Sequence, residues 1–221
     1  MTPSIELTGP RHEPASGGKA DSLVVFLHGL GADGNDLIGL APVLAQLFPD
    51  TAFVSPDAPQ PCDMAPMGRQ WFSLQDRSPA AMLAGAETAR TALDGFLNAE
   101  MERHGLAANR VALFGFSQGC MMALHTALRR PEPLAGVVGC SGHLIAPERL
   151  ADDVTARPPV LLVHGEADEV VPFAAMGAAE QALRAAEVPV EAHARPGLGH
   201  GIDQPGLELA ARFLLKVLRE G

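Results

Sequence analysis

The chain has 221 residues, of which 47% are hydrophobic and 19% are charged, a composition too apolar for an intrinsically disordered protein. Its length suits one hydrophobic core, so we expect residues 1–221 to form a single α/β domain. The formal net charge of −10 repels nucleic-acid phosphates and anionic lipid headgroups, which argues against a nucleic-acid-binding protein.

Short apolar runs alternate with longer segments in which apolar residues recur every three or four positions, a pattern typical of parallel β-α-β units. The run 23–27 is nearly continuous in apolar residues, as expected of a strand buried on both faces. We expect strands at 23–27, 51–55, 111–116, 134–140, 160–163 and 190–194, and helices at 36–47, 80–104, 118–130, 174–186 and 205–219. The sequence therefore predicts a mostly parallel central sheet with helices on both faces.

Two segments fall outside this alternation. Residues 5–7 could add an antiparallel edge strand, followed by a turn-rich connection at 9–21. Residues 56–78 are too rich in proline for a helix and too apolar for a solvated loop. Either this loop walls a ligand pocket, or its Trp71 and Phe72 fill a minor core, and the sequence leaves both interpretations open.

The cysteines and the amino terminus bear on the cellular compartment. Cys62, Cys120 and Cys140 are odd in number, widely spaced and without a C-x-x-C pair, so neither a disulfide framework nor a cysteine zinc site is indicated. The first residues lack a basic segment followed by an apolar one, and no apolar run approaches the ~18–20 residues of a membrane span. We expect a cytoplasmic protein without a metal site and without stable membrane insertion.

Residues 115–119 read Gly-Phe-Ser-Gln-Gly, a G-x-S-x-G pentapeptide between a predicted strand and a predicted helix. A serine on such a tight turn projects its hydroxyl from the carboxyl edge of the sheet, and the helix N-terminus offers N–H groups to an oxyanion. An ordinary glycine-bounded turn is the alternative, which this context disfavours. Ser117 is therefore the predicted nucleophile.

A serine hydroxyl needs a base that removes its proton. Among the eight histidines, His200 lies in a glycine-rich loop after the last predicted strand, from which it can reach Ser117. His143 is a distant second candidate. Because a base must be neutral to accept a proton, we expect the activity to fall in acid.

The base in turn needs an acid that orients it. Asp168 follows the strand predicted at 160–163 and precedes a predicted helix, which makes it the best-placed acid. The alternative interpretation is an ordinary aspartate on a solvated turn. Glu166 and Glu169 are neighbours that could replace it. With Asp168 as the acid, the chain order is serine, aspartate, histidine, as in α/β-hydrolase triads.

A second glycine loop supports a different function. Gly29, Gly31 and Gly34 form a literal G-x-G-x-x-G after a predicted strand. Asp57 lies 23 residues after Gly34, close to the spacing of ~20 residues at which a ribose-binding acid follows such a motif. One hypothesis is therefore an oxidoreductase that binds a dinucleotide with these three glycines. The same loop, which begins at His28, also fits an esterase oxyanion hole of the H-G-G-G type. A hydrolase accounts for both glycine loops, whereas a dinucleotide site leaves the serine, aspartate, histidine order unexplained.

The motifs together resemble the phospholipase/carboxylesterase family of α/β hydrolases, which includes the acyl-protein thioesterases. The resemblance spans the chain from about residue 22 to the final helix and rests on residues 28–34, 71–72, 115–119, 164–168, 171–172 and 199–201. It implies an α/β-hydrolase fold in which Ser117, Asp168 and His200 form the triad. It also implies that the backbone N–H groups of Leu30 and Gln118 form the oxyanion hole.

The resemblance has two further implications. The family often has a second glycine after the nucleophile motif, where this chain has Cys120, so packing at the start of that helix is expected to differ. A homodimer is plausible from the resemblance alone.

We expect a serine carboxylesterase that forms an acyl-enzyme and needs no cofactor, with thioesters and lysophospholipids as further candidate substrates. Only 18 residues separate Ser141 from Val160, too few for a helical cap domain, so the site should be open and take soluble, short- to medium-chain acyl esters. The residues expected to bind the substrate are Met64, Met67, Trp71 and His143. A third hypothesis is a hydrolase-fold protein that binds a ligand without cleaving it, because small misplacements within a triad abolish catalysis.

Overall fold

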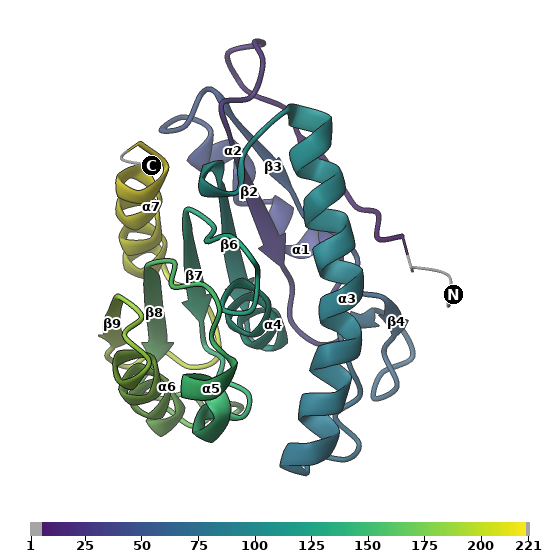
Figure 1. Cartoon of the computed structure of the whole chain (residues 1–221), viewed down its shortest axis with the longest axis vertical. Helices are drawn as coiled ribbons and strands as arrows, with labels where there is room; N and C mark the ends of the chain where they lie inside the picture. Colours follow the sequence, from purple (N-terminus) through teal and green to yellow (C-terminus); the bar gives the residue numbers. More distant parts are fainter. Residues whose placement is uncertain (1–5, 220–221) are drawn as a thin grey trace.

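The structure is a computed structural model that describes residues 6–219. Its centre is a seven-stranded sheet with the strand order β1-β3-β2-β6-β7-β8-β9 (Figure 1). All neighbouring strands are parallel except β1 and β3. The strands are β1 (Arg11–His12), β2 (Ser22–Leu27), β3 (Thr51–Val54), β6 (Val111–Phe116), β7 (Gly136–Cys140), β8 (Val160–Gly165) and β9 (Val190–Arg195). The predicted, mostly parallel sheet is confirmed.

Helices cover both faces of this sheet, as expected (Figure 1). One face carries α3 (Pro79–His104), α4 (Gln118–Ala127) and α6 (Ala174–Ala185); the other carries α1 (Gly34–Ile38), α2 (Ala41–Leu44) and α7 (Gln204–Arg219). Strand β2 divides its side chains between the two layers, because successive residues of a strand point to opposite faces. Val25 packs in the core under the first set of helices, and Val24 and Phe26 pack in the core under the second. The whole strand is buried, in agreement with its continuous apolar sequence.

The helix expected at 36–47 is divided into α1 and α2. Pro42 lies at the start of α2, where it needs no intrahelical N–H bond, and Gly39 follows the last residue of α1. A proline ring clashes with the preceding turn of a helix, so one continuous helix could not pass through Pro42 without a kink.

The antiparallel edge strand is not where the sequence placed it. Arg11 and His12 form β1 beside β3, and the backbone of Thr8 and Pro10 extends the contact through hydrogen bonds to Asp57 and Ser55. Of the segment 5–7, residue 5 lies outside the described residues and residues 6–7 form no strand, so the prediction is wrong there. Leu7 is buried in the core instead.

The proline-rich loop 56–78 contains a short antiparallel hairpin, β4 (Gln60–Pro61) and β5 (Arg69–Gln70). Trp71 and Phe72, which follow it, are 0% and 1% exposed and belong to the core that contains α3 and α4. A Cβ on Gly85 of α3 would lie 2.7 Å from the Cβ of Phe72, so the helix can approach the loop only with glycine there. The core interpretation of Trp71 and Phe72 is therefore confirmed, although the core is the main one.

No cap domain is inserted between β7 and β8, since the described stretch 141–159 holds only the short helices η2 (Pro147–Arg149) and α5 (Leu150–Asp153). Within residues 6–219, no helix combines the length and the apolar character that crossing a membrane requires.

Candidate active site

Ser117 lies on the turn that joins β6 to α4, with a backbone φ of 53° and ψ of −118°. Such a left-handed φ is strained for a residue with a side chain and is held here by tight packing. A Cβ on Gly119 would lie 1.8 Å from the carbonyl oxygen of Leu27, and one on Gly115 would lie 2.3 Å from the carbonyl oxygen of Gly119. The Ser117 N–H also donates to the Cys140 carbonyl at 2.9 Å. The two glycines of the pentapeptide therefore make the turn sterically possible.

Cys120, where the sequence departs from the pattern of the family that it resembles, is accommodated by Gly139 of β7 and by Gly142, which follows that strand. A Cβ on Gly142 would lie 2.6 Å from the Cβ of Cys120, and one on Gly139 would lie 2.8 Å from its sulfur. Burial raises the pKa of the Cys120 thiol to about 12, so this side chain is a neutral packing group.

His200 connects Ser117 to Asp168. Its Nε2 lies 3.0 Å from the Ser117 Oγ, and its Nδ1 lies 2.8 Å from Asp168 Oδ2. A carboxylate accepts only, so Nδ1–H donates to Asp168 and Nε2 is free to accept from the serine hydroxyl. The ring of Phe116 packs against His200, with their centroids 4.9 Å apart. The structure brings together the three side chains that the sequence assigned to a triad.

Asp168 is held as a carboxylate in a buried position. Its side chain is 0% exposed, and Oδ1 accepts the backbone N–H groups of Val170 and Val171, each at 2.9 Å. Burial by itself would raise the pKa of Asp168, but the hydrogen bonds from His200, Val171 and Val170 outweigh it and lower the pKa. Glu166 and Glu169, the alternative acids, are exposed and make no contact with His200 in the described hydrogen-bond network.

His164 also contacts this carboxylate, a contact that the sequence reasoning missed. Its Nε2 lies 3.0 Å from the Val171 carbonyl and 3.2 Å from Asp168 Oδ2. Both neighbours are acceptors, so Nε2 carries a proton that it shares between them. The sequence signal that could have revealed this contact is the position of His164, near the end of β8 and four residues before Asp168.

The loop that carries His200 is fixed at both ends. Arg195 and Asp203, which flank it, form an ion pair with contacts of 2.9 and 3.1 Å, and Asp203 also caps the start of α7 through the Gly206 N–H. A Cβ on Gly165 would lie 2.2 Å from the Leu198 carbonyl, so glycine lets this loop approach β8. The loop that carries His200 is therefore held in position by contacts at both of its ends.

Leu30 and Gln118 lie close to Ser117 and line the same cavity. A Cβ on Gly29 would be only 3.3 Å from the Cβ of Ser117, which shows how close the loop after β2 comes to the serine. In the part of the chain that the structure describes, neither the Leu30 N–H nor the Gln118 N–H donates to a protein acceptor. Both residues line the cavity at Ser117. Both backbone donors are therefore available to a bound group.

The first glycine loop is held by contacts within the protein. The Gly31 N–H donates to the Arg69 carbonyl at 2.8 Å, and the Arg69 N–H donates to the Ala32 carbonyl at 2.7 Å. The Gly34 N–H donates to Asp57 Oδ1 at 2.8 Å. The N–H groups of Gly31 and Gly34 are among the donors that a pyrophosphate would need at this loop, and Asp57 is the residue that the dinucleotide hypothesis assigned to a ribose. These contacts within the protein argue against a dinucleotide site at this loop.

His28 and Trp71 hold the same loop in place through buried hydrogen bonds. His28 Nε2 accepts the Ala58 N–H at 3.0 Å, so its proton is on Nδ1, 2.7 Å from the Gly29 carbonyl. Burial lowers the pKa of His28, which keeps the ring neutral. The Trp71 indole N–H donates to the His28 carbonyl at 3.0 Å. Trp71 is therefore a structural support of the glycine loop.

A cavity of about 380 Å³ opens at Ser117. Its lining is mostly apolar and comprises Leu30, Leu74, Arg77, Met82, Ser117, Gln118, Met121, His143, Val170, Val171, Pro172 and His200. His143 lines it, as predicted, and burial lowers the pKa of this histidine. Met64, Met67 and Trp71 do not line it, which corrects the predicted groove. Met64 and Met67 are 50% and 80% exposed on the loop surface, and Trp71 is fully buried.

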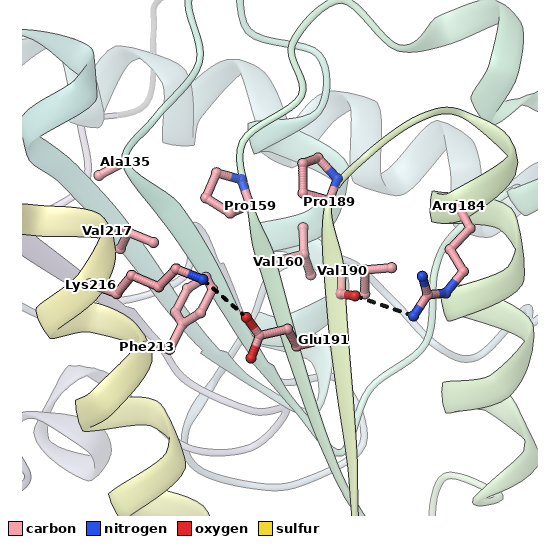
Figure 2. A pocket seen from close by; sticks show the side chains of 10 residues that line it. All are labelled: Ala135, Pro159, Val160, Arg184, Pro189, Val190, Glu191, Phe213, Lys216 and Val217. Atoms are coloured by element: carbon pink, nitrogen blue, oxygen red, sulfur yellow. Dashed lines mark hydrogen bonds and ion pairs between the residues drawn. The ribbon is translucent and has the colours of Figure 1, made fainter. Parts of the chain in front are cut away.

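A larger cavity, about 560 Å³, lies at the opposite edge of the sheet (Figure 2). It is bordered by Val160 and Val190, the first residues of β8 and β9, whereas the Ser117 cluster follows the carboxyl ends of the strands. Its cations are engaged: Lys216 lies 3.4 Å from Glu191, and Arg184 pairs with Glu180 at 2.8 Å. This cavity contains none of the predicted site residues.

Comparisons with known proteins extend over nearly the whole chain. The sequence profile described as Phospholipase/Carboxylesterase matches residues 14–218. Esterase YpfH of Escherichia coli (strain K12) is 30% identical over 195 residues, which cover 88% of this chain and 82% of that protein. Acyl-protein thioesterase 1 of Yarrowia lipolytica is 32% identical over 160 residues, 68% of this chain and 70% of that protein. The crystal structure of esterase PE8 matches with a TM-score of 0.92 and 45% identity, covering 97% of this chain and 100% of that chain.

Proposed function

The chain belongs to the phospholipase/carboxylesterase family of α/β hydrolases, and we propose that it is a serine carboxylesterase with Ser117, His200 and Asp168 as its catalytic triad. The observation that carries the proposal is the pair of contacts made by His200, 3.0 Å to Ser117 Oγ and 2.8 Å to Asp168 Oδ2. This spacing lets one imidazole take the serine proton while the carboxylate stabilises the resulting imidazolium.

In the proposed reaction, Ser117 Oγ attacks the carbonyl carbon of the ester as His200 Nε2 takes its proton. The carbonyl oxygen becomes an oxyanion, which the N–H groups of Leu30 and Gln118 bind. His200 then gives the proton to the departing alcohol, or to a thiol where the substrate is a thioester. A water molecule, deprotonated by His200, hydrolyses the acyl-enzyme and restores the free serine. In this proposed reaction the protein supplies the nucleophile, the base and the oxyanion donors, and the remaining reactants are the ester and one water molecule.

We propose acyl esters of short to medium chain length as substrates. The cavity of about 380 Å³ is mostly apolar, and Val170 on its wall is 66% exposed. Apolar lining stabilises an alkyl chain by removing it from water. Because no cap domain separates this cavity from solvent, we expect soluble esters to react without a lipid interface. Thioesters are a second candidate class, because one relative bears the name acyl-protein thioesterase.

The test is hydrolysis of p-nitrophenyl esters from acetate to palmitate by the wild type and by Ser117→Ala. We expect a maximum at short or medium chains and a loss of several orders of magnitude in the variant. Ser16→Ala, on a turn near the amino terminus, controls for a serine substitution away from the cavity. Activity that survives in Ser117→Ala would remove Ser117 as the nucleophile, and a rate that jumps above the micellar concentration would refute the open site.

A further inference from the structure

The cavity at Ser117 carries a single full charge on its lining, and that charge is positive. Arg77 is the charged member of the lining set, since the guanidinium keeps its proton at any working pH. His143 is neutral near pH 7, because burial lowers its pKa. Asp168 is buried behind His200, with a side chain that is 0% exposed. A substrate in this cavity therefore meets one cation in a protein whose net charge is −10.

Arg77 has unused donors. Most arginines of the described chain form an ion pair with a carboxylate, as Arg195 does with Asp203. Arg77 forms none within residues 6–219, and its recorded hydrogen bond runs from Nε to the Leu74 carbonyl at 3.3 Å. The two Nη atoms thus keep their N–H groups for a ligand. A guanidinium presents such donors in a planar fork that matches a carboxylate.

The acids near Arg77 in the sequence and in space do not line the Ser117 cavity. Asp76 lines a different cavity, on the side of Gln60 and Ser73, and its Oδ1 accepts the Ser78 N–H at 2.8 Å. Glu148 lines a smaller cavity of about 180 Å³ that shares Arg77, Met82 and His143 with the Ser117 cavity. Arg77 is therefore a member of the Ser117 cavity lining, whereas Asp76 and Glu148 are not, although Glu148 borders the adjoining smaller cavity together with Arg77.

We propose that Arg77 is a specificity-determining residue that makes this site prefer esters carrying a free carboxylate, an inference that rests on the proposed esterase function. The apolar walls bind the alkyl part of such a substrate, and Arg77 binds its charged end. The carboxylate belongs either to the acyl chain, as in a half-ester of a dicarboxylic acid, or to the alcohol, as in an acylated hydroxy acid. Both substrates present the same chemistry to the guanidinium.

The test compares matched ester pairs by titrating the acid released. Monoethyl adipate against ethyl hexanoate places the charge on the acyl side; 6-acetoxyhexanoate against hexyl acetate places it on the alcohol side. At about pH 7.5 both carboxylates are ionised, since their pKa values lie near ~4–5. The quantity measured is the ratio of kcat/KM for the charged ester to that for its neutral partner. The variants are Arg77→Gln and Arg77→Lys, with Arg212→Gln on α7 as the control that makes the same change in net charge.

We expect Arg77→Gln to lower the ratio about threefold to tenfold in one of the two pairs, Arg77→Lys to retain most of it, and Arg212→Gln to leave it unchanged. Added NaCl should lower the ratio in the wild type but not in Arg77→Gln, because an exposed cation is screened. A ratio that is the same in the wild type and Arg77→Gln for both pairs, or that falls equally in Arg212→Gln, would overturn the proposal. A wild type that cleaves neither the neutral nor the charged esters would instead overturn the proposed esterase function.

Discussion

The side-chain amide of Gln118 binds the backbone on both sides of the Trp71–Phe72 peptide, accepting the Trp71 N–H at 2.9 Å and donating to the Phe72 carbonyl at 2.7 Å. Gln118 is also the residue whose backbone N–H is proposed for the oxyanion hole. The nucleophile turn and the loop 56–78, which are distant in sequence, are thus joined by one buried side chain that is 1% exposed.

Gln118→Ala tests this connection while keeping the backbone N–H. The variant leaves the Trp71 N–H and the Phe72 carbonyl buried and unpaired, so we expect the free energy of unfolding to fall by about 2–4 kcal/mol. Urea denaturation measures the change, and Gln75→Ala, an exposed position in the same loop, is the control. Equal midpoints for Gln118→Ala and the wild type would contradict the supporting role.

His164 is expected to position Asp168, because its Nε2–H is shared between Oδ2 and the Val171 carbonyl. His164→Leu removes the donor and should lower kcat about tenfold with little change in KM, since the carboxylate that orients His200 loses one of its fixed contacts. His164→Gln restores an N–H donor and should recover part of the loss. If kcat falls by the same factor in both variants, or if KM changes instead of kcat, the contact between His164 and Asp168 has only a packing role.

The lowered pKa of His125 leads us to expect that the protein loses stability in mild acid. Burial, with the positive charge of Arg129 as the next cause, lowers its pKa to about 4, and Nε2 lies 2.9 Å from Glu87 Oε1. An unfolded histidine takes up a proton near pH 6.5, so between pH 6.5 and about 4 the unfolded state holds one proton more than the folded state. The free energy of unfolding therefore falls as the pH drops through this range, by up to about 3 kcal/mol from this residue.

The measurement is the free energy of unfolding in urea at several pH values for the wild type and His125→Gln. His28 and His143, whose pKa values are also lowered by burial, act in the same direction, so the variant should keep a shallower slope. Leu124→Val, a destabilised core variant with every titrating group intact, should keep the wild-type slope. A slope in His125→Gln as steep as in the wild type would show that His125 does not cause the acid sensitivity.

Asp57 should contribute to stability and not to cofactor binding. Its carboxylate accepts the Gly34 N–H at the start of α1 at 2.8 Å, so Asp57→Ala is expected to cost about 1 kcal/mol of unfolding free energy, and Asp57→Asn less. Calorimetric titration of the wild type with NAD⁺ and NADH should give no binding heat. Saturable binding that Asp57→Ala abolishes would restore the dinucleotide hypothesis.

The fold could be predicted from the sequence, and the three residues proposed as the triad could be selected, because their signals are local. Continuous apolar runs mark strands such as β2, and the glycines on either side of Ser117 mark its turn, whatever the rest of the chain does. Asp168 and His200 could be ranked because each follows a predicted strand, and parallel strands end at the same edge.

The lining of the cavity at Ser117 could not be predicted because its walls are formed by tertiary packing. Trp71 carries the same apolar signal whether it faces a ligand or the core, and its burial depends on Gln118 and on the carbonyl of His28. The cavity wall is instead formed by residues such as Leu74 and Val170, which have no motif. The division of the helix expected at 36–47 could have been predicted, because Gly39 and Pro42 are visible in the sequence. The helical spacing of the apolar residues favoured one continuous helix instead.

The most direct test of the account is the site of covalent labelling by a fluorophosphonate, located by mass spectrometry of proteolytic peptides. Only a serine activated by a neighbouring base reacts readily with such a probe. We predict one adduct, on Ser117, that forms at least about a hundredfold more slowly in His200→Ala. An adduct on another residue, or no adduct on the folded wild-type protein, would contradict the proposal that Ser117 and His200 form a working nucleophile and base.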